Sequence, residues 1–156
     1  MKKPNLVISI ILACFSIFIL LFFGASVISH PRVRRAERIL RQDYEFLVIT
    51  AQFLADSPYE SIHLWRGEME RGEMIVFDVG RIEFEDNDVV EAFRELANRR
   101  YNVIIKEGNT ITFQRWANRH EGWGVAFSLD GNEPAYRSIV IVESLSRPSW
   151  YFYITR

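Results

Sequence analysis

Hydrophobic residues follow three different patterns along this chain. An uninterrupted apolar run comes first, from Leu6 to Ile28. A stretch with apolar residues every three or four positions follows, and the rest consists of short apolar segments broken by glycine, proline, asparagine and aspartate. These patterns predict, in order, a membrane-spanning helix, an amphipathic helix and a domain rich in β-strands.

The apolar run has the length and composition of a transmembrane helix. Its 23 residues include no charge, and 16 of them are Leu, Ile, Val or Phe. As a helix the run is about 35 Å long, enough to span a bilayer with some tilt. A signal peptide cleaved near Gly24-Ala25-Ser26 and a lipoprotein signal ending at Cys14 are the alternatives. The run is too long for the first and continues past the second, so we expect an uncleaved single-pass anchor after a basic tail at 1–5.

Charge is divided between the two ends of the chain. Residues 1–41 hold seven basic residues and one acidic residue, a net charge of +6, and residues 42–156 hold 12 basic and 19 acidic residues, a net charge of −7. A domain of that sign is unsuited to nucleic acid, which requires a positive surface. The arginines after the run are candidates for contact with lipid headgroups of the bilayer, and a merely solvated flank is the alternative. These candidates are Arg32, Arg34, Arg35 and Arg38.

The side of the cell membrane that holds the domain stays open. Five arginines follow the apolar run, whereas only Lys2 and Lys3 precede it, and the positive-inside rule then places the domain in the cytoplasm. A short basic segment before an apolar run is, however, typical of exported signal-anchors. The balance leans slightly toward the extracytoplasmic side.

A juxtamembrane helix is predicted for residues 29–56. Pro31 suits its first turn, and Asp56-Ser57-Pro58 ends it. Its second half is apolar on nearly all sides, which predicts burial against the domain. A coiled-coil dimer is the alternative, although the step from Leu40 to Tyr44 breaks a strict heptad. The helical stripe consists of Val33, Ala36, Leu40, Tyr44, Leu47, Ala51 and Leu54.

Residues 57–156 predict one α+β domain, in which an antiparallel sheet packs on one or two helices. A charged turn is expected at 67–72, a hairpin turn at Gly108-Asn109, and a helix from a capping residue at Asp88 to about Arg99. Strands are expected at 61–65, 73–78, 81–84, 103–106, 110–116, 124–129, 138–142 and 150–154.

No motif predicts catalysis, a cofactor or a metal. The acidic run from Glu83 to Asp88 lacks the glycine and glutamate of a calcium loop and suits a helix N-terminus. His30, His63 and His120 have no ligand spacing, the single cysteine lies in the apolar run, and no Gly-x-Ser-x-Gly sequence is present. We therefore expect a protein without enzymatic activity, cofactor or bound metal.

The best candidate for binding is a basic and aromatic segment within the acidic domain, at a strand-to-loop turn. Its guanidinium groups and ring faces could hold an anion, a glycan or a carboxylate of a protein partner. The alternative is that the tryptophans pack on the sheet with Trp150 and the arginines pair with nearby acids. The segment consists of Arg115, Trp116, Arg119, His120 and Trp123.

Turns and aromatic residues of the C-terminal half resemble a family of small uncharacterised bacterial proteins. The resemblance rests on Gly108-Asn109-Thr110-Ile111, Phe113, Arg115-Trp116, Ser128-Leu129-Asp130-Gly131, Glu133-Pro134, Leu145-Ser146 and Trp150-Tyr151-Phe152-Tyr153. Members of that family commonly carry an N-terminal membrane segment, so the resemblance implies a bacterial membrane-anchored protein. It implies no catalytic or binding residue.

Three functions are compatible with these features. The leading hypothesis is a membrane-tethered domain that binds a protein or a surface ligand without catalysis. The second is an immunity or antagonist protein whose acidic face neutralises a basic toxin. The third is a hydrolase of unfamiliar type, which requires a cleft that joins His63 or His120 to buried acids.

Overall fold

The computed structural model describes residues 31–76, 79–118, 121–135 and 138–156. The anchor predicted at Leu6–Ile28 and its basic tail lie outside the described residues. Within the described residues, no helix has the length and apolar character needed to cross a membrane. The chain divides into two compact units, Met1–Arg32 and Val33–Arg156, and the second unit contains the sheet.

One eight-stranded sheet organises the second unit, and each strand runs antiparallel to its neighbours. In chain order the elements are α2 (Pro31–Asp56), β1 (Ser61–Trp65), α3 (Arg66–Arg71), β2 (Glu73–Val76), β3 (Gly80–Glu83), α4 (Asn87–Asn98), β4 (Val103–Glu107), β5 (Thr110–Ala117), β6 (Gly122–Ser128), β7 (Ile139–Ser144) and β8 (Trp150–Thr155). The strands lie side by side in the order β3-β2-β1-β4-β5-β6-β8-β7. The predicted α+β fold with an antiparallel sheet is confirmed.

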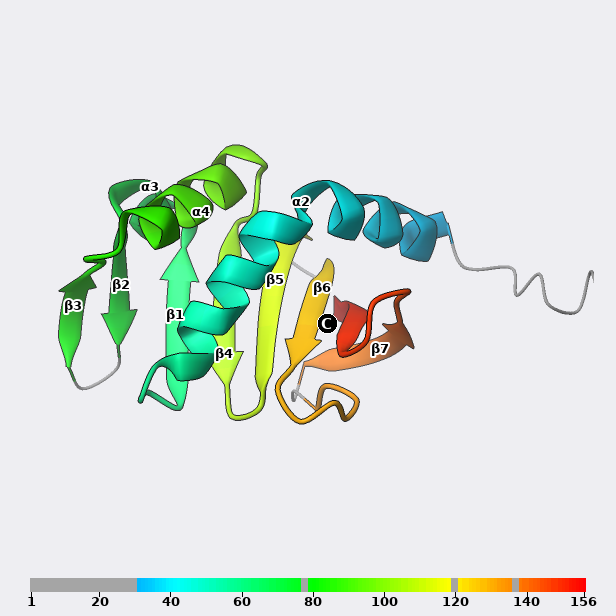
Figure 1. The fold of residues 1–156 in the computed structure, drawn as a ribbon. Coiled ribbons are helices and arrows are strands. Elements are labelled where there is room, and N and C mark those ends of the chain that lie inside the picture. The colour runs from blue at the N-terminus through cyan, green and yellow to red at the C-terminus, as the bar shows by residue number, and fades with distance from the viewer. Residues whose placement is uncertain (1–30, 77–78, 119–120, 136–137) are drawn as a thin grey trace, which may run out of the picture. The chain divides into compact units, whose positions relative to one another are not determined.

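Helices α2 and α4 cover the same face of the sheet (Figure 1). Leu47 and Leu54 of α2 and Phe93 of α4 are fully buried in one core with the strands. The rings of Phe53 and Phe93 meet edge to face, with centroids 6.0 Å apart, and so join the two helices. Most of the apolar surface of α2 is therefore used inside the domain.

Strand β1 shows how the two faces of the sheet differ. Its residues alternate, because successive side chains of a strand point to opposite faces. Ile62 and Leu64 are fully buried beneath the helices, whereas Ser61, His63 and Trp65 are exposed on the other face.

The predicted turn at 67–72 is wrong, because residues Arg66–Arg71 form helix α3. Glu68 stands at the third position of this helix, and its side chain accepts a hydrogen bond from the backbone N–H of Trp65 at 2.5 Å. This contact fixes the first turn, and Gly72, with φ of 75°, ends the helix in the left-handed conformation. The sheet thus packs with three helices rather than one or two.

The predicted cap of α4 is displaced by two residues. The carboxylate of Asp86, not Asp88, accepts hydrogen bonds from the backbone N–H groups of Asp88 and Val89, at 2.9 and 3.5 Å. The hairpin turn between β4 and β5 is confirmed, since Gly108 has the positive φ, 54°, that such turns require. The other strand boundaries differ from the prediction by two residues or fewer.

Candidate functional site

The structure separates the residues of the predicted basic and aromatic segment. Trp116 of β5 lies opposite Trp123 of β6, next to a β-bulge in β5. Trp123 is buried, whereas Trp116 is 41% exposed. Arg115 turns to Asp43 of α2, 72 positions away in the sequence. Arg119 and His120 lie outside the described residues, so the five side chains are not brought together within the described part.

The candidate lipid-binding arginines begin α2. Arg34, Arg35 and Arg38 are exposed, and Arg32 is half-buried. The guanidinium carbon of Arg35 lies 5.2 Å from the centre of the Trp123 ring, a cation–π arrangement. Their contact with lipid headgroups remains a prediction.

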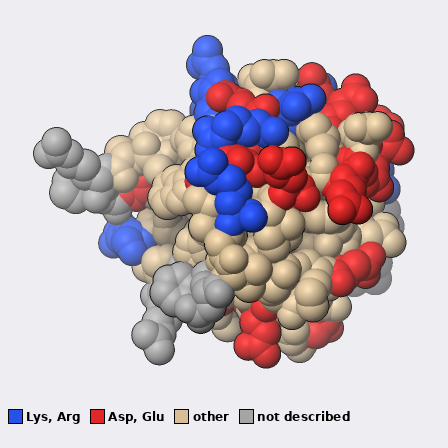
Figure 2. Space-filling model, turned by 90° about the vertical axis from the view of Figure 1, so that its left-hand side faces the viewer, with Lys and Arg blue, Asp and Glu red and all other residues tan. Residues whose placement is uncertain are grey.

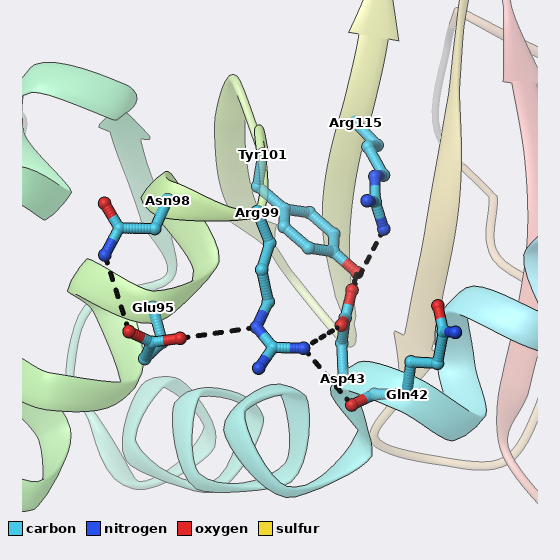
Figure 3. Close-up of polar contacts among 7 residues, drawn as sticks. All are labelled: Gln42, Asp43, Glu95, Asn98, Arg99, Tyr101 and Arg115. Atoms are coloured by element: carbon cyan, nitrogen blue, oxygen red, sulfur yellow. Dashed lines mark hydrogen bonds and ion pairs between the residues drawn. The ribbon is translucent and has the colours of Figure 1, made fainter.

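Among the buried acids of the described residues, Asp43 in the middle of α2 has the most polar partners (Figure 3). Its carboxylate is 2% exposed. Oδ1 accepts a hydrogen bond from Arg99 Nη1 at 2.6 Å, and Oδ2 accepts one from the hydroxyl of Tyr101 at 2.9 Å and one from Arg115 Nη1 at 3.0 Å. Arg99 also donates to Glu95 at 3.4 Å. One carboxylate thus links α2 to the end of α4 and to β5.

This network is suited to holding the fold rather than to chemistry. Each oxygen of Asp43 is already engaged, so neither is free to act as a base or to hold a substrate. Burial, followed by the negative charge of Asp43, raises the pKa of Tyr101 well above its ordinary value of 10.0. The hydrogen bond to Asp43 is the main cause that raises the pKa of Arg99. The proton of Tyr101 is therefore held in place.

The sequence indicates that Asp43 is buried, because this acid lies within an apolar stripe, although an analysis of hydrophobic periodicity alone does not select it. Asp43 stands three positions after Leu40 and four before Leu47, within the apolar stripe of α2. An acid at such a position requires a buried partner. Its partners Arg99, Tyr101 and Arg115 could not be identified without the sheet.

A groove of about 450 Å³ lies where strands β1 and β2 meet helix α3. It is lined by Ser61, His63, Trp65, Glu68 and Ile75. Trp65 is 58% exposed and Ile75 is 41% exposed, although both are large apolar side chains. His63 and Ile75 lie directly opposite each other on the face of the sheet that turns away from α2 and α4. The groove therefore combines an exposed indole, an imidazole and an apolar wall.

Glu68 is the acidic member of this groove and is 7% exposed. The arginines around it are engaged with other acids. Arg66 pairs with Glu70 at 2.9 Å, and both Arg71 and Arg81 pair with Glu73. Seen from the β3 edge, arginine and acidic side chains are intermixed over the upper part of the surface, toward α3 and α4 (Figure 2).

Among the described residues, no group of three histidine, cysteine, aspartate or glutamate side chains could hold a metal ion. Comparison of the chain with models of protein families, with curated proteins and with solved structures gave no match. The function is therefore inferred from the geometry alone.

Replacing Asp43 with asparagine removes the charge and keeps the shape of the side chain. Arg99 and Arg115 then share a buried site without a counter-charge, and both keep partial access to water. We expect the free energy of unfolding to fall by about 2–3 kcal/mol. Equilibrium unfolding of the full-length protein in urea and mild detergent measures the change. Glu45→Gln, an exposed acid of the same helix, is the control, and an equal loss in both variants would contradict this role.

Tyr101→Phe tests the pKa of the buried phenol. The folded protein keeps this proton at a pH where the unfolded chain releases it, so the resulting stability is present below pH 10 and is lost as the pH rises further. We expect Tyr101→Phe to lose about 1 kcal/mol at pH 7, because one hydrogen bond to Asp43 is missing. The difference from the parent protein should shrink above pH 10.

Urea unfolding of both proteins between pH 7 and 11 measures this difference. Burial lowers the pKa of Lys106 and acts in the opposite direction, but Lys106 is present in both proteins and cancels in the comparison. Stability curves that stay parallel up to pH 11 would show that Tyr101 does not titrate in this way.

Proposed function

We propose that the protein is a single-pass membrane protein whose domain binds a protein partner, without catalysis, through the sheet face that turns away from α2 and α4. The observation that carries the proposal is the groove at β1 and β2. There Trp65 and Ile75 are exposed on the same face, whereas most large apolar residues of the described chain are buried.

The chemistry of this face supports binding of a protein. One row of paired residues runs across β1, β4, β5, β6 and β8, and it consists of His63, Ile105, Thr112, Ala126 and Tyr151. The next row consists of Trp65, Val103, Gln114, Gly124 and Tyr153. Neither row contains an acidic residue, a lysine or an arginine. Depletion of charge and the presence of tryptophan are features of the centres of protein interfaces. The row members on β6 and β8 are buried, so the accessible part of the rows consists of His63, Trp65, Ile105 and Gln114.

Asp43 provides a further reason to favour binding over hydrolysis. It is the buried acid with the most polar partners in the described chain, and those partners occupy both oxygens. His63 lies instead in the exposed groove. The groove also contains the buried acid Glu68. Among the described residues, however, no hydrogen bond joins His63 to Glu68 or to Asp43, so the oriented histidine–acid pair that a hydrolase requires is not formed there.

The proposed anchor is the helix Leu6–Ile28, supported by its 23 uncharged residues. Helix α2 begins at Pro31, so few residues separate it from the proposed span. The proposal adds the lipid bilayer as a partner, with Arg34, Arg35 and Arg38 near its surface.

Membrane insertion and orientation can be measured together. The proposal places the domain on the extracytoplasmic side. A periplasmic reporter fused after Arg156 should then be active, and the protein should stay in the membrane pellet after alkaline carbonate extraction. Deletion of residues 6–28 should release it. Extraction of the complete protein would contradict the anchor, and an active cytoplasmic reporter would instead reverse the proposed orientation.

Site-specific photo-crosslinking in the cells that make the protein tests the binding face. A photoreactive residue at Ser61 or Ile75 should yield a crosslinked product, because both positions line the groove. The same residue at Glu91, an exposed position of α4, is the matched control and should yield much less. The Trp65→Ala change should weaken the crosslink from Ser61. Crosslinks from Glu91 without any from Ser61 or Ile75 would contradict the proposed face.

A further inference from the structure

We infer that the groove receives a lysine side chain of the protein partner, with its ammonium group between the carboxylate of Glu68 and the ring of Trp65. The inference rests on the proposed function, because it assigns chemistry to part of the proposed binding face. It starts from a buried negative charge, Glu68, that the described residues leave without an ion-pair partner.

Glu68 is 93% removed from solvent, and a carboxylate in that position is ordinarily paired with a cation. Within the described residues no lysine, arginine or histidine forms an ion pair with it. The neighbouring arginines are engaged elsewhere, Arg66 with Glu70 and Arg71 with Glu73. The described arginines thus leave the carboxylate of Glu68 available to a cation of another molecule.

One oxygen of Glu68 has no hydrogen bond from the described residues. Its Oε2 accepts the backbone N–H of Trp65 at 2.5 Å, and no hydrogen bond to Oε1 is formed by the described residues. Among the described residues, the hydroxyl of Thr50 is the single side-chain nitrogen or oxygen that is fully buried and has no hydrogen-bond partner. Oε1 of Glu68 also has no partner among them, so it is not fully buried. Since Glu68 lines the groove, Oε1 is reached from there.

A single available oxygen favours an ammonium group over a guanidinium group. Arginine binds a carboxylate best through two parallel hydrogen bonds, which require both oxygens. The ammonium group of lysine is a compact charge that one oxygen can hold, and the exposed face of Trp65 adds a cation–π contact. The ring of His63 lines the same groove. Ile75 can cover the methylene stem.

The openness of the groove favours a lysine within a protein over a free amine. Pockets for small molecules enclose most of the ligand surface. Here Trp65 is 58% and Ile75 is 41% exposed, so a small amine would stay largely in water. A lysine held by a protein obtains further binding energy from contacts of that protein with Ile105 and Gln114, the partly exposed members of the uncharged rows on β4 and β5.

Matched peptides and the full-length protein in detergent micelles test the inference. Four extended peptides share the sequence Val-Thr-X-Thr-Val with blocked ends, and X is lysine, arginine, N-acetyl-lysine or norleucine. Binding is followed by the indole N–H resonance of Trp65, assigned with Trp65→Phe. The lysine peptide should bind about tenfold more tightly than the acetyl-lysine and norleucine peptides, and several-fold more tightly than the arginine peptide.

Two glutamate variants distinguish the effect of the negative charge of Glu68 on binding from an effect on folding. Glu68→Gln keeps an acceptor for the N–H of Trp65 and should abolish the preference for lysine, while the affinity for norleucine stays the same. Glu70→Gln makes the same change in charge at a 50% exposed position outside the groove and should keep the preference. If Glu68→Gln fails to fold, as judged by its urea midpoint, Trp65→Leu should reduce the preference several-fold instead.

The outcomes distinguish this inference from the proposed function. Equal binding of the lysine and norleucine peptides would overturn the lysine site and leave the face as a binding surface. Equal binding of lysine and arginine would overturn the ammonium assignment, and equally tight binding of free N-acetyl-lysine methylamide would overturn the protein source. Absence of binding by every peptide would overturn the site, whereas failure of the face itself would appear as loss of the crosslinks from Ser61 and Ile75.

Discussion

The bonds of Asp43 determine where helix α2 is held against the sheet. Apolar contact is not directional, and a helix that is apolar on nearly all sides could pack at several positions along a broad sheet. The carboxylate of Asp43 fixes one of them through Arg99 and Tyr101, in the segment between α4 and β4, and through Arg115 of β5. A shifted helix would leave this buried charge unpaired, and the cost of that exceeds the gain from most apolar contacts. Specificity of packing therefore comes from a polar group, and burial of the apolar stripe follows from it.

The position of α2 also decides which surface remains for binding. Helices α2 and α4 together cover one face, so the other face is left without either of them (Figure 1). Toward β8 that face forms a small cluster of its own, in which Ala126, Tyr151 and Tyr153 are buried. Toward β1 and β2 the large side chains Trp65 and Ile75 stay exposed instead. The groove lies at that end, and short helix α3 supplies its carboxylate.

Local signals account for what could be predicted from the sequence. Alternation and turn residues predicted the strands, since these depend on neighbours within a few positions. Helix α3 was missed because six residues rich in charge resemble a turn, and its decisive contact is the bond between Glu68 and the backbone of Trp65.

The partners of Asp43 are 56 to 72 positions distant, and no periodicity encodes such pairs. The groove combines β1, β2 and α3, so neither its lining nor the missing counter-charge of Glu68 could be identified before the fold was known. The basic and aromatic segment was prominent for a different reason: adjacent residues in the sequence look like a site even when, as for Arg115, the side chain turns to the core.

Charge and groove would act at different distances in partner binding. Residues 42–156 carry a net charge of −7, and a field of that sign attracts a basic partner before contact and weakens with salt. It does not choose an orientation, because acidic side chains are spread over a wide part of the surface beside the arginines of α3 and α4 (Figure 2). The orientation of the partner requires a short-range contact that stabilises one type of side chain at one position. A single carboxylate oxygen beside an exposed indole has that property. The acidic composition that argues against nucleic acid would favour a protein that presents lysine. The groove, rather than the net charge, would then distinguish one basic protein from another.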